Sequence, residues 1–219
     1  MYNYNQSYYR LNTLARGAAR NTVMGQVLGL LGFSFLFTAA GAWLGVNLGP
    51  GAFLPALIAS FGALIALYFV RDRAPLNLGL LYLFATGEGV TLGLLLQSYL
   101  TRGLGGVVID AAATTAAITL AAGAYGTTTR RDLSGLGGIL FVGLIGVVVA
   151  SLLGIFIHLP LLHLGISLVA AVIFTGLLIY DFNRVSNTAA ASTGDAIMMA
   201  VAIYLDITRP SPIQCLLVR

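Results

Sequence analysis

Charged residues are scarce in this chain of 219 residues, and their scarcity excludes several classes of protein. They make up 8% of the sequence, seven residues are acidic, and all eleven basic residues are arginines because the chain has no lysine. Soluble globular domains carry about 25% charged residues, so a soluble domain is excluded. The single cysteine, Cys215, has no partner for a disulfide or for a Cys/His zinc site. Redox chemistry, zinc chemistry and a resident cofactor are therefore not expected.

Hydrophobic residues dominate instead, at 58% of the chain, and the mean hydropathy is +0.94. A helix needs about 20 apolar residues to cross a bilayer core. Six stretches qualify, at roughly 22–47, 52–70, 76–100, 106–126, 136–157 and 160–181, and a seventh begins near residue 194. With short loops between them, they predict an all-α integral membrane protein with seven transmembrane helices. Its single helical domain, 21–208, follows an N-terminal tail, 1–20, and precedes an atypical C-terminal tail, 209–219.

Arginine positions predict the orientation of these helices. Eight of the eleven fall in the N-terminal tail and in alternate loops, and three fall on the opposite side if the last segment spans the membrane. The eight are Arg10, Arg16, Arg20, Arg71, Arg73, Arg130, Arg131 and Arg184, and the three are Arg102, Arg209 and Arg219. Because positive residues are in excess on the cytoplasmic side, we expect a cytoplasmic N-terminus. The net charge of +4 therefore reflects topology, and no nucleic-acid partner is expected.

Two aspartates, Asp181 and Asp206, lie in or beside apolar stretches, where an ionisable group is expected to have a function. If the sixth and seventh segments are antiparallel helices, residues equidistant from the turn lie at the same depth. The midpoint between the two aspartates is 193.5, which falls in the expected turn, Ser192-Thr193-Gly194. Asp195 then belongs to the start of the seventh helix. We therefore predict that the two carboxyl groups meet inside the bundle.

Two carboxyl groups in contact at low dielectric cannot both be ionised cheaply, so such a pair tends to share a proton. It could act as a latch. The two carboxyl groups are hydrogen-bonded when they share a proton, and they repel each other when both are deprotonated. The deprotonated pair would then suit a hard divalent cation, which prefers oxygen ligands. The alternative is that each aspartate pairs separately, for example Asp181 with Arg184 three residues later.

Three further residues are candidates for the same site. Glu88 lies at the middle of the third span, where an acid must face a cavity or a partner, so it is a candidate for an ion path. The alternative for Glu88 is a protonated side chain bonded to a neighbouring helix. Asp195 is a second candidate for the ion path. Arg71, at the end of the second span, is a candidate latch for the aspartates, although an arginine there ordinarily extends to the lipid headgroups.

Sequence motifs of common enzymes are absent: there is no Gly-x-Ser-x-Gly, no His-Glu-x-x-His and no phosphate loop. An intramembrane aspartyl protease needs two aspartates, but Asp206 lies in Tyr-Leu-Asp and not in Gly-x-Gly-Asp. An enzyme is therefore not expected. Glycines at four-residue spacing indicate close helix packing in a membrane instead. These steps are Gly25-xxx-Gly29, Gly41-xxx-Gly45 and Gly89-xxx-Gly93.

Four motifs occur together in the order found in one known family. They are Gly87–Gly93, Thr127-Thr-Thr-Arg-Arg-Asp-Leu-Ser134, the Leu-Ile-Tyr-Asp that ends at Asp181 and the Ile-Tyr-Leu-Asp that ends at Asp206. Over about residues 20–207 the chain resembles the Bax inhibitor-1 family. The resemblance implies six helices around a central seventh, in a pH-sensitive calcium leak channel of the bacterial inner membrane. It implies that Asp181 and Asp206 form the gate and a transient Ca²⁺ site, with Arg71 able to engage them.

Two departures from the family pattern leave other functions open. Ser60 stands where the family can carry an acid, and the apolar run of the seventh helix ends at Ile207. From Asp195 to Thr208 a helix would then span only about 21 Å. One alternative to the leak channel is a non-conducting regulator that binds other membrane proteins, such as proteases. Another is a proton-coupled cation exchanger.

Overall fold

The structure is a computed structural model that describes most of the chain. It covers residues 3–70, 72–73, 75–129, 131, 133–156, 160–188 and 191–208, and it describes only the backbone of 3–21, 155, 156, 160, 161 and 163. These parts of the chain form seven α-helices and one short 3₁₀ helix, with no strand. The elements are α1 (Asn3–Leu48), η1 (Pro50–Ala52), α2 (Phe53–Val70), α3 (Leu76–Thr101), α4 (Gly105–Thr128), α5 (Ser134–Phe156), α6 (Pro160–Asn187) and α7 (Thr193–Thr208).

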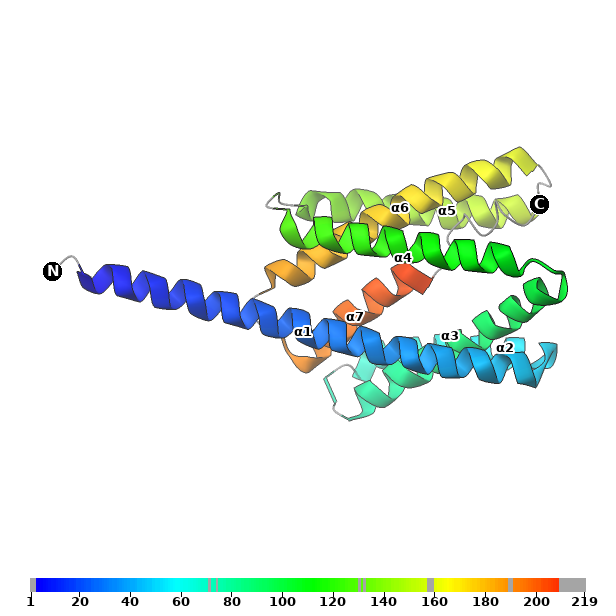
Figure 1. Ribbon diagram of the computed structural model, residues 1–219, viewed down its shortest axis with the longest axis horizontal. Helices are drawn as coiled ribbons and strands as arrows, with labels where there is room; N and C mark the ends of the chain where they lie inside the picture. The colour runs from blue at the N-terminus through cyan, green and yellow to red at the C-terminus, as the bar shows by residue number, and fades with distance from the viewer. Residues whose placement is uncertain are drawn as a thin grey trace.

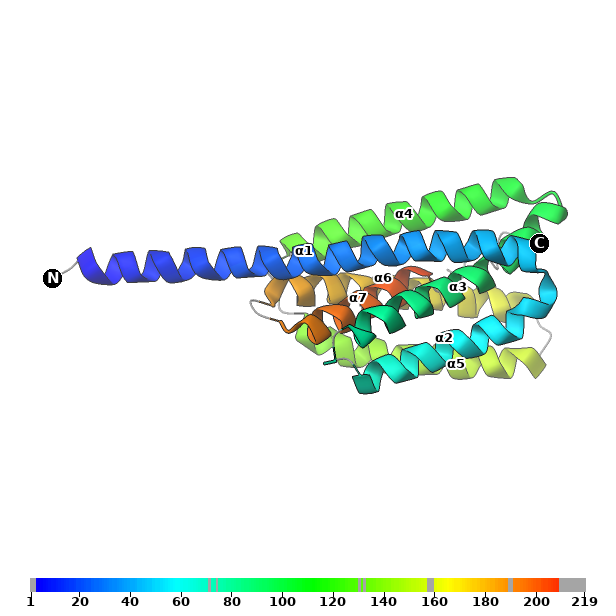
Figure 2. The ribbon, with the colours of Figure 1, turned by 90° about the horizontal axis from the view of Figure 1, so that it is seen from below.

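Six of these helices are long and apolar enough to cross a membrane, which confirms the six predicted spans and the all-α membrane class. The sixth runs to Asn187, so Asp181 lies inside α6 and not at its end. The first helix is also longer than expected, because α1 begins at Asn3. The segment expected as a tail, residues 1–20, is thus helical from residue 3 and continuous with the first span (Figure 2).

The seventh helix, α7, has 16 residues and is therefore about 24 Å long. A bilayer core is about 30 Å thick, so α7 is shorter than a full crossing. This agrees with the early end of its apolar run in the sequence. Residues 209–219, expected as an atypical tail, lie outside the described residues.

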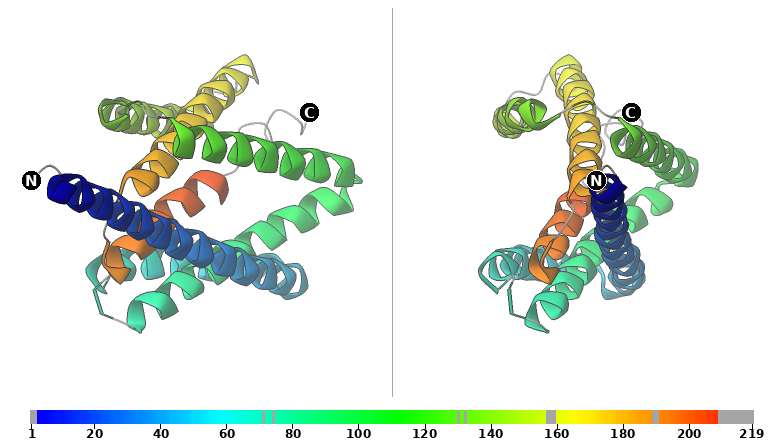
Figure 3. Two further views of the ribbon diagram at one scale, coloured as in Figure 1. Left: turned by 60° about the vertical axis from the view of Figure 1, so that its left-hand side comes forward. Right: turned by 90° about the vertical axis from the view of Figure 1, so that its left-hand side faces the viewer.

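The six longer helices form two groups of three, with α7 between them (Figures 1 and 3). In one group α1 and α2 pack against α3, and in the other α4 and α5 pack against α6. The short helix α7 contacts α1 and α3 on one side and α6 on the other. Each group alone leaves an apolar face uncovered toward the centre, and α7 covers both.

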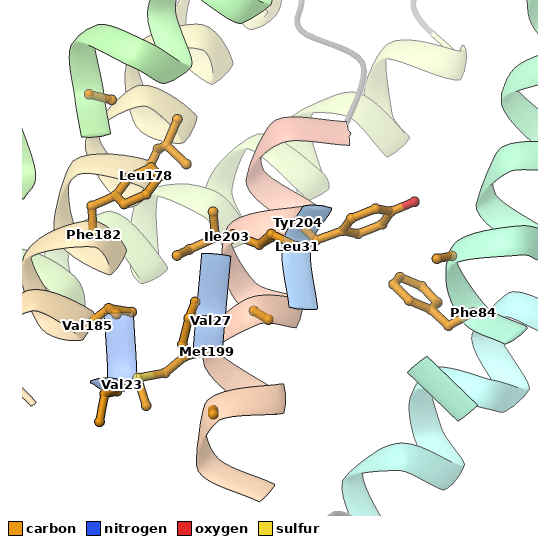
Figure 4. Packing of buried hydrophobic residues seen from close by; sticks show 14 of the residues in the cluster. Val23, Val27, Leu31, Phe84, Leu178, Phe182, Val185, Met199, Ile203 and Tyr204 are labelled. Carbon is orange, nitrogen blue, oxygen red and sulfur yellow. The ribbon is translucent and has the colours of Figure 1, made fainter. Parts of the chain in front are cut away.

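Burial confirms α7 as the central helix that the family resemblance implies. Eight of its 16 residues are buried, whereas only 6% of the span in α5 is buried. Ile203 and Tyr204 of α7 are fully buried. They share one apolar cluster with Val27 of α1, Phe84 of α3 and Phe182 of α6 (Figure 4). The position of α7 is therefore fixed by side chains from both groups of helices.

Two of the three glycine steps interlock between α1 and α3. A methyl group added at any of these four glycines would overlap a backbone carbonyl of the opposite helix. The contacts are Gly41 on Thr86, Gly45 on Val90, Gly89 on Thr38 and Gly93 on Ala42. Since later residues of α1 meet later residues of α3, the two helices run in the same direction. They are held by backbone against backbone, as expected for such steps in a membrane.

The third glycine step, Gly25-xxx-Gly29, was wrongly expected to pack against another helix. Nothing lies within 4 Å of a methyl group added at either glycine. Both residues are exposed, because the buried face of this part of α1 is formed by Val23, Val27 and Leu31. Spacing alone does not say which face of a helix a glycine pair occupies.

Candidate functional site: the aspartate pair and the polar groups around α7

Asp181 of α6 and Asp206 of α7 face one another in the structure. Their side chains lie within hydrogen-bonding reach, and both residues are partly buried. A hydrogen bond between two carboxyl groups needs a proton on one of them, because an ionised carboxylate is only an acceptor. The geometry therefore places the two groups where they can share one proton.

The chain brings these aspartates together by a different route from the predicted one. The turn expected at 192–194 is wrong, because α6 ends at Asn187 and α7 already begins at Thr193. Asp181 is six residues, about 9 Å, before the end of α6, and Asp206 is 13 residues, about 20 Å, after the start of α7. A symmetric hairpin would not align them. They meet nonetheless, because α6 and α7 pack against each other, as the orange and red helices in Figure 3 show.

Asp195 closes a capping box at the start of α7. The Ser192 hydroxyl oxygen accepts a hydrogen bond from the Asp195 N–H at 3.1 Å. In return, the Asp195 carboxylate accepts bonds from the Ser192 N–H at 3.2 Å and from its hydroxyl at 2.9 Å. Reciprocal bonds of this kind satisfy backbone donors that a helix start leaves open. This gives Asp195 a structural role, while its part in an ion path stays a prediction.

A cavity of about 410 Å³ lies between α6 and α7. Arg184 and Thr188 of α6 line it, together with Asp195, Met198 and Ala202 of α7. Residues three or four apart share a helix face. Asp181 precedes Arg184 by three residues and Asp206 follows Ala202 by four, so both aspartates continue the two faces that line the cavity. The cavity thus lies at the α6–α7 turn, and the aspartates lie about one helical turn beyond the residues that line it.

Arg184 gives Asp181 a second interaction. Its positive charge acts on the Asp181 carboxyl group, which is the arrangement that the sequence offers as an alternative to the pair. Asp181 thus interacts both with Asp206 and with Arg184, so the two alternatives do not exclude each other. Arg184 is exposed, and solvent weakens such an interaction. Arg71, the predicted latch, lies outside the described residues.

Glu88 lies midway along α3 and faces the centre of the molecule. Gly87 packs against Ser60 of α2, and Gly89 packs against Thr38 of α1. Between them, the Glu88 side chain is close enough to Tyr204 of α7 for an electrostatic interaction. This acid therefore has a polar neighbour on the central helix. Its part in an ion path stays a prediction.

Two hydroxyl residues of α1 were not identified from the sequence. The Thr38 hydroxyl is 2.6 Å from the Tyr204 hydroxyl, in a buried hydrogen bond. Ser34, one turn earlier on the same face, is 1% exposed. The available signal was their spacing, because two hydroxyl residues four apart in an apolar span share one helix face. Their partner on α7 could not be identified without the fold.

Within the described part of the chain, no three His, Cys, Asp or Glu side chains come together in a way that could hold a metal ion. A cation at the aspartate pair would have two carboxyl groups, and its other oxygen ligands would be backbone carbonyls or water. Ca²⁺ takes six to eight oxygen ligands.

These features define a class: a polytopic, all-α membrane protein whose short central helix carries one half of a carboxylate pair. The family model described as "Inhibitor of apoptosis-promoting Bax1" matches residues 20–209. The chain therefore belongs to the Bax inhibitor-1 family, as its motifs indicate.

Relatives of this chain are found in several bacteria. The "Modulator of FtsH protease YccA" of Escherichia coli K12 is 32% identical over 158 residues, which are 72% of this chain and 70% of that protein. The "Uncharacterized protein Cj0236c" of Campylobacter jejuni is 31% identical over 213 residues, covering 93% and 91% of the two chains. An "Uncharacterized membrane protein" of Vibrio cholerae is 31% identical over 204 residues, covering 91% and 90%.

Proposed function

We propose that the protein is a passive, pH-sensitive Ca²⁺ leak whose gate is the pair Asp181 and Asp206. The observation that carries this proposal is the contact between the two carboxyl groups, which lie about one helical turn from residues that line the α6–α7 cavity. The pair holds α6 and α7 together while it shares a proton. Loss of that proton leaves two like charges in a poorly solvated place, where they repel strongly.

The deprotonated aspartate pair also attracts Ca²⁺, the ion that we propose it passes. Carboxylate oxygens are preferred ligands of Ca²⁺, and the cavity beside them has room for the waters that complete its coordination. Arg184 at the cavity wall competes with the cation for Asp181, so it opposes a permanently occupied site. Ca²⁺ and protons are thus the ligands of the gate, and no cofactor is required.

We place the protein in the bacterial inner membrane, and the arginine distribution supports an N-terminus in the cytoplasm. In that orientation the α6–α7 turn and the cavity face the cytoplasm. The gate then responds to cytoplasmic pH. A rise in pH opens it, and a fall in pH closes it.

Ca²⁺ flux into liposomes that contain the purified protein tests the proposal. We expect wild-type flux to rise from about pH 6 to about pH 8, as the shared proton is lost. Asp206→Asn should remove this pH response, because the pair then holds one ionisable group. Asp110→Asn changes an exposed acid of α4 and serves as the control. If Asp206→Asn leaves both the flux and its pH response unchanged, the gate is wrongly assigned.

A second function is favoured by the E. coli relative named as a modulator of a membrane protease. Under this alternative the protein conducts nothing and binds other membrane proteins through its outward faces. A stoichiometric membrane-protein partner that copurifies, together with absent flux, would support it. A proton-coupled exchanger is separated from both by flux that stops when the proton gradient is abolished at constant pH.

A further inference from the structure

A second polar cluster lies on the opposite side of α7 from the aspartate pair. It consists of Ser34 and Thr38 of α1, Glu88 of α3 and Tyr204 of α7, and we call it the central polar cluster. Tyr204 and Asp206 are two residues apart, which is about 200° around a helix. One therefore points toward α1 and α3 while the other points toward α6. The two polar sites share a helix but not a surface.

Contacts on α3 direct Glu88 toward this cluster. Phe84, one turn before Glu88, packs its ring against that of Tyr204, with centroids 5.5 Å apart. Residues four apart share a helix face, so Glu88 follows Phe84 on the side that meets α7. Gly87 and Gly89 are turned toward α2 and α1 instead. The Glu88 carboxyl group therefore lies next to Tyr204, and their electrostatic interaction agrees with this.

The direction of the hydrogen bonds leaves oxygen atoms available in this cluster. The Thr38 hydroxyl donates its one hydrogen to the Ser34 carbonyl at 2.9 Å. The bond of 2.6 Å between Thr38 and Tyr204 must then have Tyr204 as its donor. The Tyr204 oxygen keeps its acceptor capacity and lies against Thr38 of α1.

Ser34 supplies an independent sign that something binds here. Its hydroxyl oxygen is buried and is the one buried side-chain polar atom, within the part of the chain that the structure describes, that has no hydrogen-bond partner. An unsatisfied buried polar group costs about 1 to 3 kcal/mol, and a bound water or ion is one way in which native proteins satisfy it. Ser34 precedes Thr38 by one turn and therefore shares its face of α1.

We propose that the central polar cluster binds a partly dehydrated hard cation. Glu88 provides the negative charge, and the hydroxyl oxygens of Ser34, Thr38 and Tyr204 are neutral ligands. All four groups offer oxygen atoms as ligands. Hard cations such as Ca²⁺ and Na⁺ prefer oxygen ligands, whereas softer metals do not. The choice of Ca²⁺ as the ion rests on the proposed function. The site itself rests on the arrangement of these side chains.

Thermal unfolding of the purified protein in detergent, with and without CaCl₂, tests this site. The double variant Asp181→Asn/Asp206→Asn should keep a Ca²⁺-dependent rise in Tm, because its central polar cluster is intact. Adding Glu88→Gln to it should abolish that rise. Choline chloride at matched ionic strength separates binding from a salt effect.

Ser34→Ala separates a role in Ca²⁺ binding from a role in structure alone, because the two roles predict different changes in Tm and in Ca²⁺ affinity. Without Ca²⁺ its Tm should equal or exceed that of wild type, because an unsatisfied hydroxyl has been removed. Its Ca²⁺ affinity should fall at least about tenfold, since loss of even an outer-shell partner weakens metal sites by that much. Ser167→Ala, which removes another buried serine, from α6, is the matched control.

The outcomes separate this site from the proposed gate. If the Asp181→Asn/Asp206→Asn variant shows no Ca²⁺ response, or if Ser34→Ala binds Ca²⁺ as wild type does, the central polar cluster is not a cation site. Should Glu88→Gln fail to fold, Ser34→Ala still decides. If Ca²⁺ binds through Glu88 but liposomes show no flux, the leak is refuted and the site remains.

Discussion

The contact between α1 and α3 is formed by different chemical groups from the contact between α6 and α7. In the first, four glycines bring two backbones together, and the packing at these glycines uses no ionisable group. In the second, two carboxyl groups face each other, an arginine acts on one of them, and a cavity of about 410 Å³ lies alongside. One interface is close-packed, and the other has room and charge.

This difference indicates which interface can move. Glycine contacts of this kind have no flexible side chain that could absorb a displacement, and close-packed interiors transmit strain instead of yielding to it. The α6–α7 contact, by contrast, depends on a proton and borders free volume. We therefore expect α1 and α3 to form the fixed frame and α6 to move relative to α7 when the pair ionises.

The largest expected effect comes from adding methyl groups to the close-packed contact between α1 and α3. Gly41→Ala together with Gly89→Ala adds two methyl groups where backbone carbonyls already lie. Overpacking costs about 1 to 3 kcal/mol for each site, so the double variant should lose roughly 2 to 6 kcal/mol of unfolding free energy. Unfolding in detergent, followed by circular dichroism, measures this loss.

Gly25→Ala together with Gly29→Ala is the matched control in the same helix. Open space surrounds both positions. Alanine is favoured over glycine in a helix by about 0.5 to 1 kcal/mol, so this double variant should be more stable than wild type. Equal effects from the two double variants would mean that close packing is not what holds α1 against α3.

A smaller effect on stability is expected at the contact between α6 and α7, which we call the adjustable interface. Raising the pH ionises both Asp181 and Asp206, and two like charges at about 4 Å repel by about 1 kcal/mol in water and about 4 kcal/mol at an effective dielectric constant of 20. Wild-type Tm should therefore fall at alkaline pH. Asp206→Asn removes one charge, and we expect it to recover roughly 1 to 3 kcal/mol there. The measurement is Tm against pH for both proteins.

Asp110→Asn is the control for this series, because Asp110 is exposed in α4. It should follow the wild-type curve at every pH. If Asp206→Asn also follows that curve, the two carboxyl groups do not carry opposing charges in the folded protein, and the contrast between the interfaces disappears.

Most of the fold could be predicted because lipid imposes a simple rule. Apolar runs long enough to cross a bilayer gave six helices. Short loops did not show which helices pack together, because α1 packs mainly against α3 and α4 packs against α6. The helix ends were less predictable: Asp181 was placed at the end of the sixth span, yet α6 continues to Asn187. Its last residues are polar, and packing against α4, including the Asn183 bond to the Gly126 carbonyl at 3.1 Å, keeps them helical.

The candidate site could be predicted only in part. Carboxylates are rare enough in this chain that Asp181, Asp206 and Glu88 stand out in the sequence. Hydroxyl residues do not, because serine and threonine are common in membrane helices and bond to their own backbone. Thr38 became informative only when folding placed Tyr204 against it. The capping box of Ser192 was likewise hidden, since the turn was expected there.

Tyr204→Phe is expected to have a moderate effect on stability, through the contact of α7 with α1. It removes the hydroxyl that bonds to Thr38, and a buried hydrogen bond contributes about 1 kcal/mol. The ring contacts with Phe35 and Phe84 remain, so packing should be preserved. Tyr68→Phe, at a residue that is 63% exposed, is the control. A loss near zero for both variants would show that apolar packing alone holds α7 against α1.

The smallest expected effect comes from Ser192→Ala, at the turn that joins the two moving helices. Loss of an N-cap costs about 0.5 to 1 kcal/mol at an exposed site, so Tm should fall slightly. The exposed Ser151→Ala in α5 should not change it. The same variant also releases the Asp195 carboxylate toward the cavity that it lines. If Ca²⁺ flux rises while stability falls only slightly, Asp195 belongs to the ion path; if flux stays constant, Asp195 serves the helix start alone, and the adjustable interface begins at the aspartate pair.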